Sequence, residues 1–425
     1  MDRREFSKGM ALATVAGLMD VRNVFSDTVA PMSNSNGQAS IYPKFSHNTK
    51  ITIEKIDIFP VRYPMVMRFK FFEGPVSGGG RPTVIIKITA NDGTVGWGES
   101  VPIPRWSGET IEGAVACLKN YLIPVLIGKD VFDLEEIHHT MTKEMASDFS
   151  TTYPITRAGI DLALYDLIGK ALKQNVAEML GRKTPDDLLL SWTLNPKDLS
   201  EIEGLMQKGR ERGFENFNVK ISPDTKFDLE LCKTVKKLAP NGFLWADANC
   251  GYDVATALEM ASKLADAGVA VFEGALHPNC ISGYQQLVKQ GALPIIMDEG
   301  CVSPVEVEEF MKLKMLNGIA MKPSRCGGLT SAIAQMNLLE KYNLKFLGSG
   351  LTDPDISLAA SLILYGAYNL QHPAALNGPQ FLGTSVLKEP FKVNGGRVRI
   401  PKGPGLGIEV DEDKVKDLSA STWKG

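Results

Sequence analysis

Apolar and polar residues alternate along residues 51–59, and a second apolar-rich segment covers residues 83–89. Alternation with a period of two is typical of a strand with one buried face, so both segments are predicted strands. An Asn-Asp-Gly sequence at 91–93 indicates a hairpin turn after the second strand. The apolar spacing then becomes helical over about 111–126, 133–146 and 155–173. Together these elements predict a compact α+β domain over residues 51–185.

Beyond Pro185, short apolar segments alternate with helical stretches of 10 to 15 residues, which is typical of repeated βαβ units. The eight candidate strands cover residues 188–193, 216–221, 243–247, 269–273, 293–297, 318–322, 344–348 and 369–374. Eight strands suit a closed barrel, and an open doubly wound sheet is the competing fold. No Gly-x-Gly-x-x-Gly motif follows the first strand to hold a dinucleotide. We therefore predict an α/β fold with a (β/α)8-type, modified TIM barrel at 186–390, and a segment at 391–425 that returns to the α+β capping domain.

The first fifty residues lack the patterns of a folded domain. Residues 2–8 read Asp-Arg-Arg-Glu-Phe-Ser-Lys and precede a weakly apolar run at 9–19, which resembles a twin-arginine export signal. The run is too short for a membrane span, which needs about 20 residues. Residues 20–50 are rich in Ser, Asn and Asp and are interpreted as a linker. We expect a periplasmic or exported protein if the signal at 1–19 is functional, and a cytoplasmic one if it is not.

Composition limits the kinds of partner. The chain has 44% hydrophobic and 22% charged residues and a formal net charge of -3, so neither nucleic acid nor an anionic membrane is an expected partner. A small molecule is the expected ligand, and a homo-oligomer is compatible with the sequence. The six cysteines include no Cys-x-x-Cys pair, so no zinc knuckle or dense disulfide framework is indicated.

Polar side chains end five consecutive predicted strands of the barrel. These residues are Lys220, Asp247, Glu273, Asp298 and Lys322, and the intervals between them are 27, 26, 25 and 24 residues. Each interval is one βα unit, so all five side chains should emerge at the carboxyl-terminal mouth of the barrel, where barrel enzymes hold their active sites.

Three of these residues are carboxylates, which repel one another strongly unless a cation lies between them. An all-oxygen ligand set favours Mg²⁺, or Mn²⁺, over zinc, and the chain has only five histidines. Asp247, Glu273 and Asp298 are therefore the predicted metal ligands. Lys220 and Lys322 should flank the metal from opposite sides, where burial and a nearby dication would lower the pKa of a lysine enough to make it a base.

Several strings of residues resemble the muconate-lactonizing subgroup of the enolase superfamily, and the likeness runs from about residue 51 to the end. They are Gly-Phe-Glu-Asn-Phe-Asn-Val-Lys at 213–220, Asp-Ala-Asn at 247–249, Phe-Glu at 272–273, Asp-Glu at 298–299, Lys322 with Cys-Gly-Gly-Leu at 326–329, Gly-Trp-Gly-Glu-Ser at 96–100, Thr-Arg-Ala-Gly-Ile-Asp-Leu-Ala-Leu-Tyr-Asp at 156–166 and Pro-Gly-Leu-Gly at 404–407. The resemblance implies that Asp247, Glu273 and Asp298 bind Mg²⁺ and that Lys220 and Lys322 form the acid/base pair. Enolase-superfamily sites use a Lys or His base beside Mg²⁺.

The chain departs from the subgroup pattern at three strands. The usual Lys-x-Lys of the second strand is Asn218-Val219-Lys220, so one positive charge is missing. The seventh strand ends in Gly-Ser-Gly at 348–350, whereas mandelate-racemase-like members have a His there. Dipeptide epimerases carry Asp-x-Asp near the eighth strand, but residues 375–379 read Ala-Leu-Asn-Gly-Pro, a form that resembles members acting on N-modified amino acids or hydroxyprolines.

Two capping loops, at about 65–80 and 102–108, are expected to close over the barrel mouth. Their aromatic residues are candidate apolar walls, and Arg68, Lys70 and Arg105 are candidate partners for an anionic tail. Phe71 and Phe72 are further wall candidates. The predicted substrate-contacting residues are Phe69, Trp106, Asn218, Asn249, Asp353 and Asn377.

These patterns favour an enzyme that removes a proton alpha to a carboxylate of a small acid. The first hypothesis is a racemase or epimerase of an amino-acid derivative, with one lysine removing the proton and the other returning it. The second is a dehydratase, or an o-succinylbenzoate-synthase or cycloisomerase-type enzyme. A non-catalytic metal-dependent binding protein and a Schiff-base aldolase are the remaining alternatives, and the aldolase would not need three carboxylates.

Overall fold

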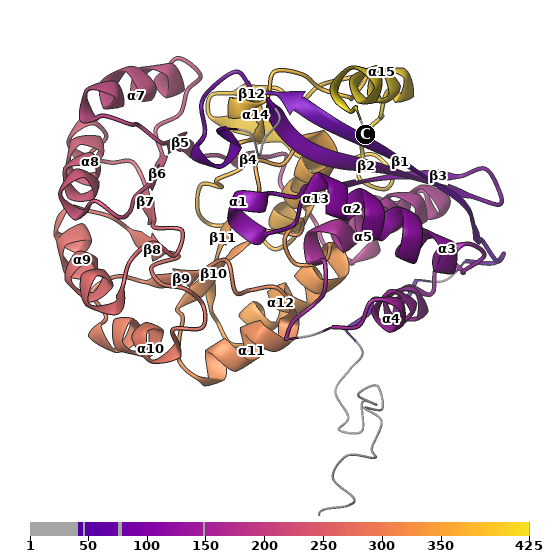
Figure 1. Cartoon of the computed structure of the whole chain (residues 1–425), viewed down its shortest axis with the longest axis horizontal. Helices are drawn as coiled ribbons and strands as arrows, with labels where there is room; N and C mark the ends of the chain where they lie inside the picture. Colours follow the sequence, from indigo (N-terminus) through magenta and orange to yellow (C-terminus); the bar gives the residue numbers. More distant parts are fainter. Residues whose placement is uncertain (1–40, 46, 75–78, 148, 425) are drawn as a thin grey trace, which may run out of the picture. The chain divides into compact units, whose positions relative to one another are not determined.

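Figure 1 shows the computed structural model, which describes residues 41–425 apart from 46, 75–78, 148 and 425. The expected export signal at 1–19 and most of the expected linker at 20–50 lie outside the described residues. Among the described helices, none is both long and apolar enough to cross a membrane.

The capping domain begins with the predicted antiparallel sheet. Strands β1 (Ile53–Pro64), β2 (Gly80–Ala90) and β3 (Val95–Ser100) pair in sequence order. The predicted turn joins β2 to β3, and Gly93 takes the positive φ of 84° that the turn requires. Both strand predictions and the hairpin are confirmed, and β1 extends five residues further than the alternation indicates.

Helices cover one face of this sheet. The predicted helix at 111–126 forms as α2 (Ile111–Cys117), a π-helical turn η4 (Leu118–Leu122) and α3 (Ile123–Leu126), and α4 (Leu134–Glu144) and α5 (Pro154–Leu172) follow. The short helices η2 (Lys70–Phe72), α1 (Pro104–Ser107) and α6 (Val176–Met179) lie in connections. Helix α5 is buried along most of its length because β3 approaches it closely. A Cβ on Gly98 would lie 1.9 Å from the carbonyl oxygen of Gly159, so glycine is required there.

The last part of the expected linker packs on this domain. The ring of Phe45 meets Tyr165 of α5 edge-on at a centroid separation of 6.1 Å, and His47 stacks on Phe132 at 5.5 Å. Residues from Ile41 onward thus belong to the same compact unit as the rest of the described chain.

The second domain contains seven parallel strands in the order β11-β10-β9-β8-β7-β6-β5, with helices on the outside of the curled sheet (Figure 1). The strands are β5 (Trp192–Leu194), β6 (Phe217–Lys220), β7 (Leu244–Asp247), β8 (Val271–Glu273), β9 (Ile295–Met297), β10 (Gly318–Met321) and β11 (Lys345–Gly348). The helices are η5 (Leu199–Glu201), α7 (Ile202–Arg210), α8 (Thr225–Leu238), α9 (Val254–Asp266), α10 (Ile281–Gln290), α11 (Pro304–Lys312), α12 (Leu329–Lys341), α13 (Asp355–Ala367) and α14 (Gly378–Phe381). This arrangement confirms the predicted α/β barrel class.

The first and the eighth predicted strands differ from expectation. Residues 188–193 divide into β4 (Asp187–Leu189), which pairs outside the barrel, and β5 inside it. Residues 369–374 form no strand, and Ala374 and Ala375 alone bridge to Leu190 and Ser349. The amide of Ala375 donates to the carbonyl oxygen of Gly348 at 2.8 Å, so an irregular segment closes the gap between the first and the seventh barrel strands.

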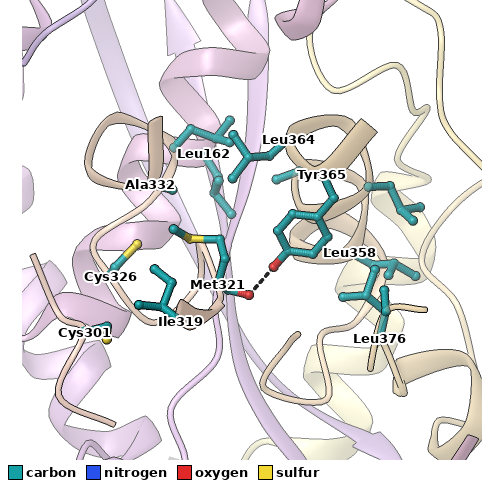
Figure 2. Close-up of a cluster of buried hydrophobic side chains, with 14 of the residues drawn as sticks. Leu162, Cys301, Ile319, Met321, Cys326, Ala332, Leu358, Leu364, Tyr365 and Leu376 are labelled. Carbon is teal, nitrogen blue, oxygen red and sulfur yellow. Dashed lines mark hydrogen bonds between the residues drawn. The ribbon is translucent and has the colours of Figure 1, made fainter. Parts of the chain in front are cut away.

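The outer face of β10 packs against α12 and α13 of the barrel and against α5 of the capping domain. Figure 2 shows this cluster, in which Leu162 of α5 and Tyr365 of α13 lie near Met321. The hydroxyl of Tyr365 donates to the carbonyl oxygens of Met321 and of Ser349, the latter at 2.6 Å. Because Met321 directly precedes Lys322, this contact fixes the backbone from which the predicted catalytic lysine emerges.

The C-terminal segment contacts both domains. Strands β12 (Val393–Asn394) and β13 (Arg397–Arg399) form a small antiparallel sheet with β4. Helix α15 (Glu412–Thr422) lies beside the capping sheet in Figure 1. There the hydroxyl of Ser419 donates to the carbonyl oxygen of Pro60 at 2.9 Å, and Lys87 pairs with Glu412 at 2.6 Å.

Candidate active site

The strand register places the predicted site residues side by side. Lys220, Asp247 and Glu273 are the last residues of β6, β7 and β8, and the register pairs Asp247 with each of the other two. Asp298 directly follows β9, and Lys322 directly follows β10. The strand-end spacing in the sequence therefore brings all five residues to one end of the parallel sheet.

Each lysine contacts a different aspartate. Lys220 donates to Oδ2 of Asp247 and Lys322 donates to Oδ2 of Asp298, and all four side chains are largely or fully buried. Arg325, in the loop after β10, donates to the other oxygen of Asp298. Sequence reasoning missed Arg325, which lies three residues after the strand-end lysine and reaches Asp298 only through the fold of this loop.

The buried charged groups shift one another's pKa values. Burial alone would raise the pKa of Asp298, but Lys322 and Arg325 outweigh it and hold the pKa below its ordinary value. Burial alone would lower the pKa of Lys220, but Asp247 and Glu273 outweigh it and raise the pKa. Lys220 is therefore held as an ammonium group by its carboxylate neighbours in this arrangement.

Glu273 is the carboxylate without a cationic contact. It is 1% exposed, and its Oε1 has no hydrogen-bond partner among the described residues. Burial, followed by repulsion from Asp247 and Asp298, raises its pKa well above the ordinary value. A carboxylate placed so close to two others is stabilised by a cation between them.

The residues around this cluster also suit a cation. Gly274 has no side chain to fill the space, and a Cβ there would lie 3.2 Å from Oδ1 of Asp247 and 3.3 Å from Oε2 of Glu299. The Oε2 atom of Glu299 is buried without a partner among the described residues, and burial, followed by repulsion from Asp298 and Asp247, raises the Glu299 pKa to about 7. Among the described residues, no three Asp, Glu, His or Cys side chains lie close enough together to hold a metal ion, and two of the carboxylates contact lysines instead. The donor chemistry still fits a hard metal ion.

A small cavity lies over these residues and holds most of the predicted substrate contacts. Its lining includes Phe69, Trp106, Asn218, Asn249 and Asn377, together with Lys220, Glu273 and Lys322. Its volume is about 20 Å³, which is room for a water molecule or two. An organic acid can therefore enter only if the side chains over the mouth move.

Aromatic side chains from the capping loops form the roof of this cavity, as the sequence predicts. The ring of Phe69 is stacked on Phe381 of α14 at a centroid separation of 4.7 Å. The ammonium of Lys322 lies 4.8 Å from the centroid of the Trp106 ring. Phe72 packs with Trp106 in the apolar cluster beside the cavity.

The polar residues of the cavity wall differ in what they contact. The Oδ1 atom of Asn218 accepts from the hydroxyl of Thr193 at 2.9 Å, so this residue is fixed and neutral where the subgroup usually has a lysine. Asn249 donates to Asp247 through both its backbone and side-chain nitrogens, at 2.8 and 3.1 Å. Asn377 donates to Thr193 at 3.2 Å, and its own Oδ1 has no partner among the described residues.

Asp353 lies apart from the cavity wall. Its carboxylate accepts from the hydroxyl of Ser324 at 2.9 Å and from the backbone amide of Leu351 at 3.2 Å. Burial raises its pKa. The structure therefore places this predicted substrate contact in the support of the loop after β11.

Models of two protein families match the chain. The N-terminal domain of the mandelate racemase/muconate lactonizing enzyme family matches residues 61–181, and the enolase C-terminal domain-like family matches residues 201–414. This chain belongs to the enolase superfamily. The relatives below place it in the muconate-lactonizing subgroup, as the sequence motifs predict.

Relatives within the superfamily cover nearly the whole chain. Chloromuconate cycloisomerase CbnB of Cupriavidus necator is 28% identical over 363 residues, which are 84% of this chain and 95% of the relative. N-succinyl-L-Arg/Lys racemase of Bacillus cereus is 24% identical over 86% of this chain and 98% of its own. The o-succinylbenzoate synthase of Bacillus subtilis is 26% identical over 86% and 96%, respectively.

Solved structures show the same fold. The muconate lactonizing enzyme of Klebsiella pneumoniae superposes with a TM-score of 0.78 at 24% identity, covering 88% of this chain and all of the other. That of Pseudomonas putida gives the same TM-score and identity over 86% and 99%. Thus the superfamily relatives share the architecture and differ among themselves in the reactions for which they are named.

Proposed function

We propose that this protein removes a proton from the carbon next to a carboxylate of a small acid and returns a proton to the same carbon, as a racemase or epimerase of an amino-acid derivative. The observation that carries the proposal is that Lys220 and Lys322 line one cavity from the ends of β6 and β10. Three strands of the curled sheet separate them, so an acid bound between them would meet one lysine on each side.

Asp247, Glu273 and Asp298 would hold a magnesium ion, for which Mn²⁺ is a substitute. Enzymes of this superfamily branch generally use Mg²⁺, and the unpartnered Oε1 of Glu273 supports a cation in the same place. When bound, the ion would supply positive charge to the negative charge that develops on the carboxylate as the proton leaves.

The two lysines supply the proton transfers. One ammonium must first lose its proton to solvent to act as base, and the loss of its contact with an aspartate would favour that step. The other keeps its proton and donates it to the opposite face of the planar carbon. Removal from one face and return on the other inverts the configuration, while the reverse sequence uses the same residues with exchanged roles.

The remaining side chains position the acid and exclude water. Phe69 and Trp106 cover the cavity, and the ring of Trp106 restricts Lys322 from the capping side. Asn377, with an unpartnered Oδ1, can accept a hydrogen bond from an N–H group of the substrate. Such an acceptor suits an amino-acid derivative.

A one-base reaction is the second candidate, because the relatives include o-succinylbenzoate synthase. In a dehydratase or a synthase of this kind, one lysine would remove the proton from the α-carbon. The leaving group would then depart, and no proton would be returned to the α-carbon. Only one of the two lysines would then be essential for proton exchange, which separates the candidates.

Solvent deuterium uptake tests the proposal. The magnesium-loaded protein is incubated in D₂O with N-acylated amino acids and hydroxyprolines, and the α-carbon is followed by NMR and mass spectrometry. We expect deuterium at the α-carbon of at least one acid, with loss of optical activity. Loss of water from the acid supports the lyase, and no exchange with any acid of the panel would refute proton abstraction from this class.

A further inference from the structure

We infer that a second cavity, between the loop after β11 and the segment after α14, binds a free amino acid with an apolar side chain. The inference goes beyond the proposed reaction, because neither catalytic lysine and none of the carboxylates at the barrel mouth lines this cavity. It starts from two groups of opposite charge that line one cavity and do not pair with each other.

The second cavity has room for a small molecule as it stands. Its volume is about 290 Å³, whereas the catalytic cavity has a volume of about 20 Å³. Drug-sized ligands occupy cavities of about 300–1,000 Å³, so a smaller molecule is the better fit. The walls come from residues 353–358 and 378–391 and from Arg212, which follows α7.

Arg212 supplies a positive charge with donors to spare. Its Nη2 atom donates to the carbonyl oxygen of Pro379 at 3.1 Å, and its guanidinium carbon lies 5.5 Å from the centroid of the Trp192 ring. No carboxylate in the described ranges pairs with it, and burial lowers its pKa. A guanidinium has five N–H donors in a planar fork, and it binds a carboxylate through two parallel hydrogen bonds. The donors left over on Arg212 therefore suit a carboxylate.

Asp355 supplies a negative charge with an acceptor to spare. It is 9% exposed, and its Oδ2 accepts from the hydroxyl of Ser385 and the amide of Val386, both at 2.8 Å. Its Oδ1 has no hydrogen-bond partner in the described part of the chain. Burial raises the Asp355 pKa, and Lys414, which lowers it, itself donates to the carbonyl oxygen of Leu387 at 2.8 Å. The ionised form of Asp355 therefore gains from an ammonium group bound at Oδ1.

A zwitterion satisfies both groups at once. Arg212 and Asp355 line the same cavity, and no ion pair joins them in the structure as described. A ligand with one carboxylate and one ammonium would bridge them and would add no net charge. Much of the remaining wall is apolar and includes Leu358, Leu382 and Phe391. Burial against such a wall favours an apolar side chain on the ligand.

A thin wall separates this cavity from the catalytic one. Gly378 lines the second cavity, and its neighbour Asn377 lines the catalytic cavity. A Cβ on Gly378 would lie 2.0 Å from the carbonyl oxygen of Asp353, so the two segments of the wall pack too closely for a side chain. The Asp353 carboxylate already accepts from Ser324 and Leu351 and brings no free acceptor to the ligand. A bound amino acid would therefore contact the segment that positions Asn377.

Three ligands with the same branched apolar group test the inference. Leucine has both charges, 4-methylpentanoate lacks the ammonium, and 3-methylbutylamine lacks the carboxylate. Titration calorimetry gives Kd for each enantiomer of leucine and for both analogues. The proteins are the magnesium-loaded wild type, Arg212→Met, Asp355→Asn and the control Arg182→Met. Arg182 is matched to Arg212 because its guanidinium carbon lies 3.7 Å from the centroid of the Tyr368 ring, yet it does not line the cavity.

We expect one or both enantiomers of leucine to bind the wild type about 10-fold or more tightly than either analogue, because each analogue lacks one charge-assisted contact. Arg212→Met should bind leucine no more tightly than 3-methylbutylamine, and Asp355→Asn no more tightly than 4-methylpentanoate. Arg182→Met should match the wild type. If Asp355→Asn does not fold, the wild type and Arg212→Met decide the question. Equal Kd values for leucine and 4-methylpentanoate on the wild type, or unchanged leucine affinity in Arg212→Met, would overturn the inference.

A further variant separates the two cavities, since the catalytic cavity also attracts carboxylates. Lys322→Ala should keep the wild-type Kd for leucine, because Lys322 lines the catalytic cavity alone. Loss of leucine binding in Lys322→Ala but not in Arg212→Met would place leucine in the catalytic cavity and refute the second site. Because every readout is a Kd, the result does not depend on whether the protein racemises any acid.

Discussion

Buried carboxylates occur in two regions of this molecule, and their partners differ. At the seam between the capping domain and the barrel, Glu99 accepts from Tyr63, Ser357 and a backbone amide, and Asp161 accepts from Thr330 and contacts His138. At the barrel mouth the carboxylates face one another and two lysines instead. Burial of charge therefore does not by itself mark a functional site. A functional site is indicated instead by buried carboxylates that do not receive hydrogen bonds from neutral hydroxyl or amide donors.

The largest expected effect concerns the metal. Removing the ion with a chelator should abolish proton exchange, and restoring Mg²⁺ should raise the unfolding free energy by about 2.7 kcal/mol at 100 times its Kd. Glu273→Gln should lose this gain, yet its metal-free form should be at least as stable as the metal-free wild type because repulsion from Asp247 and Asp298 is relieved. Urea unfolding with and without Mg²⁺ measures both the stabilisation by the ion and the stability of the metal-free forms.

Glu109→Gln is the matched control, because Glu109 is a buried carboxylate of the seam that accepts from Thr156 at 2.7 Å. We expect this variant to keep the full stabilisation by Mg²⁺. Full activity of a rigorously metal-free wild type, or an undiminished Mg²⁺ effect in Glu273→Gln, would remove the distinction between the two regions.

The second expected effect lies at the seam. Asp161→Ala leaves the amide of Thr330 without its partner at 3.2 Å, and the hydroxyl of Thr330 loses its partner at 2.6 Å and keeps the longer contact with Tyr165 at 3.3 Å. Each unsatisfied buried group costs about 1–3 kcal/mol, so the unfolding free energy should fall by at least that amount. Urea unfolding measures it, with Asp417→Ala at an exposed position as the control. An unchanged stability would show that the seam contacts contribute little.

The last expected effect concerns the pH dependence of the seam. Burial is the main cause that raises the Glu99 pKa from 4.5 to about 7, so the folded state keeps a proton that the unfolded state releases between these values. The stability from this proton is complete below pH 4.5 and is lost as pH rises through 7. Over that window Glu99→Gln should remove a slope of up to about 1.4 kcal/mol per pH unit. Identical slopes of urea stability in both proteins would contradict it.

Much of the framework could be predicted from the sequence because regular patterns carry it. The period-two alternation identified the capping strands, and the strand-end intervals placed Lys220, Asp247 and Glu273 in adjacent registers. The strand predicted at 369–374 was wrong, because Pro373 offers no amide and closure depends on two residues that bridge to distant parts of the chain.

The contacts that the loops make could not be predicted from the sequence either. The pairing of Arg325 with Asp298 requires the loop after β10 to fold back on the barrel, and no pattern reports that turn. The support role of Asp353 depends on Ser324, twenty-nine residues away. Arg68 was a candidate by charge alone, and the structure shows that it donates to both carboxylate oxygens of Glu73.

The central claim is that one cavity presents a lysine to each face of the substrate's α-carbon. Exchange of the α-proton in D₂O is measured by NMR for each enantiomer separately, with Lys220→Ala and Lys322→Ala. Each variant should lose exchange from one enantiomer, and both should lose racemisation by about 10²-fold to 10⁴-fold or more. The account predicts opposite enantiomers for the two lysines. Wild-type exchange of both enantiomers in either variant would contradict it.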